Sequence, residues 1–167
     1  GTLAISIGSD PIRMDKVRGS FKNLRVNFKP SKKPVHFPKG EIDITLKKAT
    51  VKVQITNEIG ADSKLDLKAI GRKEDGQSVI LTIPTDQQEI VGGKNNEPVV
   101  SLITFDETNS NVLEFLNLIP STIELQGGIL IHDLDAWVNQ TDAMGLKIIF
   151  QSPLDLVMGE TLLFTDS

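Results

Sequence analysis

The segment His132-Asp133-Leu134-Asp135 contains the residue types in this sequence that are best suited to chemistry. It places an imidazole and two carboxylates within four residues, a combination that could serve acid–base catalysis or hold a metal ion. Zinc and calcium both require further ligands, and the sequence has only two histidines and no such ligands nearby. We therefore interpret the segment as a structural loop and predict no metal site and no cofactor.

Other motifs of enzymes are missing from the sequence. Gly92-Gly93-Lys94 lacks the spaced first glycine and the Ser or Thr of a phosphate-binding loop, so we expect a turn there. The sequence has no Gly-x-Ser-x-Gly elbow, and because it has no cysteine, thiol catalysis and disulfides are excluded. Paired carboxylates for glycoside cleavage meet in space and leave no spacing to recognise. We predict that the chain is not an enzyme.

An apolar helix and the sole tryptophan are candidates for binding an apolar ligand. The helix is predicted over 111–119, beginning at the capping residue Asn111 and ending at Pro120, and it is apolar nearly all round. It either closes one end of a β-sandwich or lines a hydrophobic groove, and the tryptophan is either a loop anchor or a stacking platform for sugars. The residues assigned to ligand binding are Val112, Phe115, Leu116, Ile119 and Trp137.

The charge of the chain is unevenly distributed. The net charge is −4, but residues 1–55 carry twelve Lys or Arg against four Asp or Glu, whereas residues 56–167 carry six against eighteen. Either the basic part packs against the acidic part, or it forms a surface for an anionic partner such as lipid headgroups, a polysaccharide or, least favoured, nucleic acid. The residues assigned to such a surface are Arg25, Lys47, Lys48 and Lys52.

The elements that must position these side chains are strands. Residues 51–56 alternate between apolar and polar, the period that buries one face of a strand. If 58–60 form a three-residue loop with Gly60 in the left-handed conformation, a hairpin results in which Val53 faces Leu65. Apolar residues then meet on one face at each step.

A second hairpin is predicted around the loop Glu74-Asp75-Gly76, again closed by a glycine. In its register Ala69 faces Leu81, and Leu67 faces Ile83. The two hairpins together predict a three-stranded meander.

Several further features complete the predicted fold. A strand of about fifteen residues that ends near residue 55 would contain a bulge near Lys47-Lys48 and span roughly 50 Å. The proline- and lysine-rich tract 29–40 is expected to be an exposed loop, Pro98 to Thr104 a strand, and Gly127-Gly128 a bend or bulge. We predict an elongated, mainly antiparallel β-sandwich or rolled sheet with one short helix, forming one domain over 1–167 with an alternative subdivision near 105–111.

Two segments resemble known families. The stretch Thr50 to Gly60, followed by Leu65 to Ala69, resembles the late-embryogenesis-abundant β-domain family, in which an alternating strand runs into Asn and then an "ip" or "ig" turn. The segment Ile119 to His132 is similar to strands of large exported β-rich proteins of bacterial envelopes, although His132-Asp133 stands where Asn-Pro is frequent. The resemblance implies a non-enzymatic, extended β-domain of an envelope or surface protein and transfers no functional residues.

The favoured function is therefore a non-catalytic structural or binding domain of a larger exported protein. Its expected partners are the other domains of that protein, and its expected location is periplasmic, outer-envelope or extracellular. The alternatives are a carrier of lipid or another apolar ligand in a groove of a curved sheet and, more weakly, an anion-binding module. No window of the sequence approaches 18 apolar residues, so no transmembrane segment is predicted.

Overall fold

The computed structural model describes residues 2–8, 12–13, 17–35, 45–84, 88–93, 97–133, 135–139 and 141–153. Within these ranges the chain forms thirteen strands and one short helix. Their bounds are β1 Thr2–Gly8, β2 Ile12–Arg13, β3 Val17–Gly19, β4 Leu24–Asn27, β5 Ser31–Pro34, β6 Thr50–Asn57, β7 Ser63–Arg72, β8 Ser78–Leu81, β9 Glu89–Ile90, β10 Val99–Asp106, α1 Val112–Asn117, β11 Thr122–Ile131, β12 Ala136–Val138 and β13 Ala143–Pro153.

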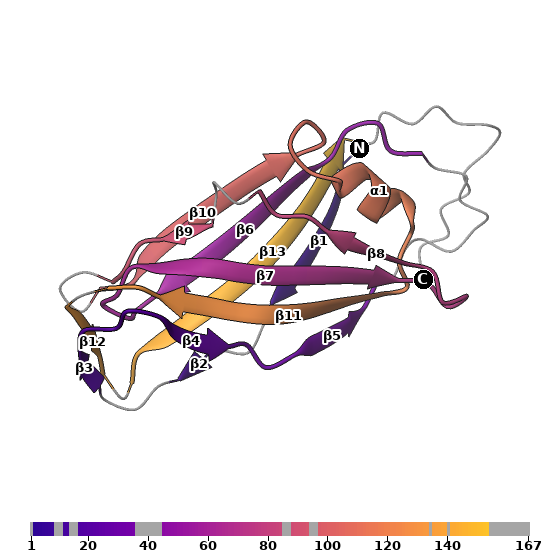
Figure 1. Cartoon of the computed structure of the whole chain (residues 1–167). Helices are drawn as coiled ribbons and strands as arrows, with labels where there is room; N and C mark the ends of the chain where they lie inside the picture. Colours follow the sequence, from indigo (N-terminus) through magenta and orange to yellow (C-terminus); the bar gives the residue numbers. More distant parts are fainter. Residues whose placement is uncertain are drawn as a thin grey trace.

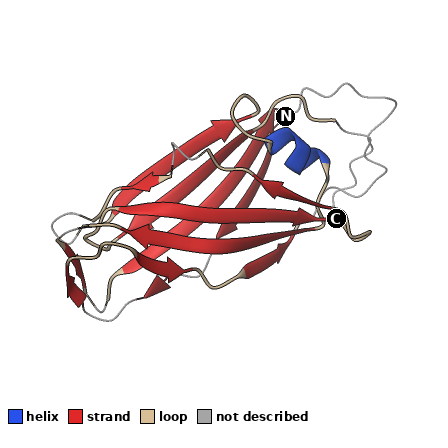
Figure 2. Ribbon diagram, in the orientation of Figure 1, coloured by secondary structure: helices blue, strands red, loops and turns tan. Residues whose placement is uncertain are grey.

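The strands form two antiparallel sheets that lie face to face (Figure 1). The five-stranded sheet has the order β1-β13-β6-β10, with β2 also paired to β13. The six-stranded sheet has the order β4-β11-β7-β8, with β5 also on β11 and β9 also on β7. Figure 2 shows that strands dominate and that the helix sits at one end, while the β12–β3 ribbon lies at the other. The predicted class, a mainly β antiparallel sandwich with one short helix, is confirmed.

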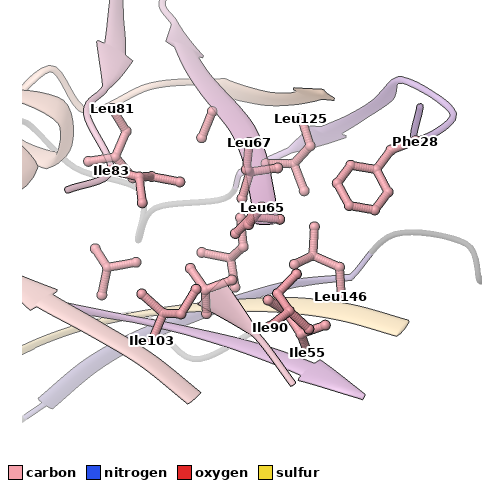
Figure 3. Packing of buried hydrophobic residues seen from close by; sticks show 14 of the residues in the cluster. Phe28, Ile55, Leu65, Leu67, Leu81, Ile83, Ile90, Ile103, Leu125 and Leu146 are labelled. Atoms are coloured by element: carbon pink, nitrogen blue, oxygen red, sulfur yellow. The ribbon is translucent and has the colours of Figure 1, made fainter. Parts of the chain in front are cut away.

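Alternate residues of the long strands fill the space between the two sheets. In β6 the burial alternates at every position, because successive side chains of a strand point to opposite faces. Figure 3 shows Leu65 and Leu125 of the six-stranded sheet facing Ile55 and Leu146 of the five-stranded sheet. The largest fully buried side chains are Phe105, Phe115, Phe150, Ile55, Ile59, Leu65, Ile90, Ile123, Ile129, Ile131, Met144 and Ile148.

The first predicted hairpin, in which Val53 faces Leu65, is wrong. Val53 pairs with Ile103 of β10 and Ile148 of β13 in the five-stranded sheet, whereas Leu65 pairs with Ile129 of β11 in the other sheet. The chain therefore crosses from one sheet to the other between β6 and β7, and the three-stranded meander does not form. Both apolar rows are still buried because they line opposite sides of the same core.

The second predicted hairpin is confirmed in loop and register. Ala69 pairs with Leu81, the Lys73 N–H donates to the Gln77 carbonyl at 2.9 Å, and Gly76 has a φ of 92°. That φ is in the left-handed region, where glycine pays no steric penalty. The further predicted pair, Leu67 with Ile83, is wrong because β8 ends at Leu81.

The prediction of a long strand ending near residue 55 is wrong for residues 45–49, which do not form a strand. The earlier part of that predicted strand, residues 41–44, lies outside the described residues. The strand begins only at Thr50. The Leu46 N–H donates to the Asn117 side-chain oxygen at 2.7 Å, and the Asn117 amide donates back to the Leu46 carbonyl at 3.1 Å. A loop held by the helix, and not a bulged strand at Lys47-Lys48, therefore precedes β6.

The proline- and lysine-rich tract contains an edge strand, β5, which the sequence did not predict. Its residues pair with β11 on the side opposite β7, and 36–40 lie outside the described residues. The register of β11 shifts by one residue between β5 and β4, while its register with β7 is continuous. At Gly127, within the predicted bend or bulge, φ is 125°. The register shift arises in the opposing chain, where three residues between β4 and β5 lie opposite two residues of β11.

The helix α1 is a plug at one end of the sandwich. Phe115 is fully buried and stacks on Phe150 of β13, with ring centroids 5.4 Å apart and 9° between the planes. The helix is shorter than predicted, and the expected side-chain cap is wrong: Asn111 precedes the helix but makes no capping hydrogen bond. Its side chain instead accepts from the Thr82 N–H at 2.8 Å and donates to the Ile80 carbonyl at 2.9 Å.

Candidate functional site

The residues predicted to bind an apolar ligand do not form one wall. Val112, Phe115 and Leu116 are buried side chains of the core. Ile119 is half-buried and lines a shallow hollow beside the β7–β8 loop. Trp137 lies on β12, at the other end of the molecule (Figure 1). A carrier would have to open the end of the sandwich that the helix closes in order to expose Val112, Phe115 and Leu116. No ligand-binding groove is formed by the predicted residues, and the carrier hypothesis stays a prediction.

Trp137 is held against the backbone of Gly60. The two residues exchange both backbone hydrogen bonds, at 3.0 and 3.2 Å. A Cβ atom at position 60 would lie 2.3 Å from Cε2 of the indole, so only glycine allows the ring to lie where it does. The contact fixes the half-buried indole against the backbone of residue 60, and the choice between a loop anchor and a stacking platform stays a prediction.

The residues predicted to bind an anion are not brought together on one surface. Arg25 lies on β4 of the six-stranded sheet, where its guanidinium is 2.6 Å from the Asp66 carboxylate. Lys52 lies on the outward row of β6 in the other sheet. Lys47 and Lys48 are exposed in the loop before β6. The Arg25–Asp66 pair is an example of the first interpretation of the charge asymmetry, in which basic residues pack against acidic ones.

The segment around His132 and Asp133 is built as a loop. The Asp133 carboxylate accepts from the Asp62 N–H at 3.1 Å and from the Asp135 N–H at 3.0 Å, and His132 is exposed with its Nε2 3.7 Å from Glu89. Among the described residues no group of three or more His, Asp or Glu side chains is arranged to hold a metal ion. These contacts agree with the interpretation of the segment as a structural loop.

The surface that stands out is the free edge of β10, by which we mean the side of residues 99–105 that faces away from β6. β10 is the last strand of its sheet among the strands described. No charged residue occurs from Val99 to Phe105. Val100 and Leu102 point outward, with 57% and 60% of their surface exposed. The edge is thus long, uncharged and apolar on its outer face.

The backbone of β10 points alternate peptide groups toward this free edge. The N–H and C=O of one residue in an antiparallel strand point to the same side, and the side alternates along the chain. The Asp106 N–H donates to the Asn109 side chain and its C=O accepts from the Ser110 N–H, so the backbone of this even-numbered residue faces away from β6. The same must hold for Val100, Leu102 and Thr104. No described residue bonds to the backbone of these three on that side.

The Asp106 side chain fixes the turn that ends the strand. Its carboxylate accepts from the Thr108 hydroxyl at 2.6 Å and from the Thr108 N–H at 2.8 Å. These two bonds stabilise the charged form and lower the pKa of Asp106. The one charged side chain of β10 is therefore that of Asp106, at the C-terminal end of the strand.

Two other edges of the sandwich carry protective features that the described residues do not provide for β10. Natural sheets block edges with lysine, proline, short strands or covering groups. The β8 edge is only four residues long and is covered by the Asn111 side chain. The β5 edge contains Lys32, Lys33 and Pro34. By comparison, no described residue covers the backbone of β10 along its free edge.

Comparison with protein-family models, curated proteins and solved structures finds no match for this chain. The resemblances to late-embryogenesis-abundant and envelope proteins thus stay predictions. In the described part of the chain there is no helix with the length and apolar character needed to span a membrane.

Proposed function

We propose that this chain is a non-catalytic binding domain that adds an extended partner segment as a strand at the free edge of β10. The observation that carries the proposal is an edge strand that is uncharged from Val99 to Phe105, with Val100 and Leu102 exposed beside backbone groups that no described residue pairs. In strand addition, backbone hydrogen bonds supply affinity and alternate side chains supply specificity. The β10 edge offers both.

The partner segment is expected to be extended, uncharged over its centre and apolar at alternate residues. Residues directly opposite each other in an antiparallel pair share a face of the sheet. The outward row of β10 would therefore contact β-branched or aliphatic residues of the partner. A proline opposite Leu102 would remove a hydrogen-bond donor from the ladder.

The proposal includes the setting implied by the sequence resemblance. A strand-adding sandwich suits a domain that joins neighbouring domains of a larger exported protein, in the periplasm, the outer envelope or outside the cell. The interior supports a structural or binding role more than a carrier role, because the described core side chains pack against one another across the two sheets.

Amide hydrogen exchange tests the binding edge directly. The probe is an eight-residue peptide of alternating Val and Thr with a lysine at each end, and the control is the same peptide with two central prolines. In dilute protein, the first peptide should slow exchange at the amides of Val100, Leu102 and Thr104, while the proline peptide should not. Equal exchange with and without the first peptide, at concentrations up to its solubility limit, would overturn the proposal.

A further inference from the structure

We infer that the segment recognised at the β10 edge is β10 of a second copy of this chain, so that two five-stranded sheets join into one continuous sheet. The inference rests on the proposed function, since it names the partner of that same edge. Its basis is that the edge is complementary to itself. Closed dimers have twofold symmetry and use the same surface of both copies. A twofold axis perpendicular to the sheet would pair the two β10 strands antiparallel.

One register brings the exposed apolar side chains together. With Ser101 on the twofold axis, Val100 of each copy lies opposite Leu102 of the other, and four outward apolar side chains form one cluster. Val100 and Leu102 are also the residues whose peptide groups face the free edge, so each of these pairs can exchange two backbone hydrogen bonds. The same residues thus supply both the apolar contact and the hydrogen bonds.

The charge distribution also permits this pairing. Like charges directly opposite each other destabilise a strand pair, and residues 99–105 contain none. Thr104 would lie opposite Pro98 of the second copy, and since proline has no N–H, the ladder ends there. The pairing is therefore limited to the uncharged part of β10.

A dimer of this kind is closed. Each copy uses its one β10 edge, so no further copy can add at the same place, whereas pairing of β10 with a different edge would give an open chain of copies. The strand β8 does not offer an equivalent edge, because the Asn111 side chain already bonds to its backbone at Ile80 and beside it at Thr82.

Sedimentation equilibrium of the whole chain tests the association. The wild type should behave as a monomer–dimer equilibrium, and Leu102→Lys should weaken dimerisation by at least about tenfold, because two lysines would replace the centre of the apolar cluster. The matched control is Ile80→Lys, which places the same charge at an exposed aliphatic residue, 48% accessible, on the covered edge. It should leave the dimer unchanged.

Cysteine cross-linking tests the register, because the chain has no cysteine of its own. Ser101→Cys should form a disulfide with Cys at the same position in the second copy under mild oxidation. Directly opposite residues of two paired strands have their Cα atoms about 4.4 to 6.8 Å apart, the range that a disulfide needs. Val100→Cys, Leu102→Cys and Thr104→Cys should each cross-link poorly. Preferential linkage at 102 would place a different residue on the axis and overturn the inference.

The outcomes separate this inference from the proposed function. A wild type that stays monomeric at high concentration, but whose β10 amides are protected by the extended peptide, would overturn self-pairing and leave the binding edge standing. A wild type that forms open-ended assemblies would also overturn the closed dimer. Loss of the dimer in Leu102→Lys but not in Ile80→Lys, with Ser101→Cys linking to itself, would support it.

Discussion

Single residues decide how closely two backbone segments approach in this sandwich. The indole of Trp137 packs directly against Gly60, where a side chain would leave no room for it. Gly92 lies so near the backbone of Ala61 that a Cβ atom at position 92 would come within 2.7 Å of that backbone. The Gly92 N–H donates to the Asp62 carboxylate at 2.8 Å. In these positions glycine serves close packing, where the sequence suggested only turns. Neighbouring residues in the sequence carry no signal of such a contact, since the group that approaches comes from a distant segment.

Gly60→Ala tests the contact with Trp137. We expect the free energy of unfolding to fall by about 1–3 kcal/mol, because the added methyl group must displace the ring or the backbone. The matched control is Gly19→Ala in the adjacent β3, where a Cβ atom would meet nothing within 4 Å. Urea titration followed by the fluorescence of the sole tryptophan measures both variants. Equal midpoints for the two would contradict the assigned role of Gly60.

Elements of this fold are predictable where the turn chemistry is local. The loop 74–76 contains its own determinants: Gly76 at positive φ, and the Asp75 carboxylate, which accepts from the Gln77 N–H at 2.9 Å. At the end of β6 the Asn57 side chain makes the same kind of local bond, accepting from the Ile59 N–H, but it also donates to the carbonyl of Val91, far along the chain. The chain crosses into the second sheet there, and the local turn chemistry carries no signal of the bond to Val91.

Alternation of apolar residues predicts the face of a strand but not its partner. The rows of Val53 and Leu65 satisfy the same pattern whether they pair in one sheet or face each other across the core. The β10 strand was predicted, but its place at an edge was not. Four of the five residues over 99–103 are apolar and they fall in both rows, a pattern typical of a central strand. Of the candidate site, the sequence therefore predicted the strand, and only the strand order, in which β10 has no described partner except β6, shows its free edge.

The helix α1 depends on contacts outside itself, because six residues are too few for a helix to be stable alone. Asn117→Ala removes both hydrogen bonds to the backbone of Leu46, which is partly buried there. We expect a loss of about 1–3 kcal/mol in the free energy of unfolding, the cost of leaving such groups unsatisfied. Chemical denaturation followed by circular dichroism measures it.

The control for this prediction is Glu114→Gln, on the exposed side of the same helix. Glutamine has nearly the same shape as glutamate, and the side chain at 114 has no hydrogen bond to Leu46, so the stability of this variant should stay within about 0.5 kcal/mol of the wild type. If Asn117→Ala were as stable as Glu114→Gln, the two hydrogen bonds between the Asn117 side chain and the Leu46 backbone would not contribute to stability.

The whole molecule is assembled from strands that are distant in sequence. β1 pairs with β13, so the two ends of the described chain lie in one sheet. Each sheet takes strands from both sides of residues 105–111: β6 and β10 join β13 in one, and β7 joins β11 in the other. A boundary at 105–111 would therefore cut through both sheets and the core between them. Neither half retains a complete layer without the other.

This arrangement predicts that the chain unfolds as one cooperative unit. The fluorescence of Trp137 reports on the ribbon at one end, and far-ultraviolet circular dichroism reports on the strands throughout, so coincident urea midpoints are expected from the two probes. The measurement belongs at low protein concentration and also in Leu102→Lys, where association contributes least. Two separated transitions, or a tryptophan signal that changes well before the strands are lost, would mean that the ends of the sandwich are energetically independent. A single shared midpoint is expected because each sheet contains strands from both halves of the sequence, so neither half can unfold while the other stays folded.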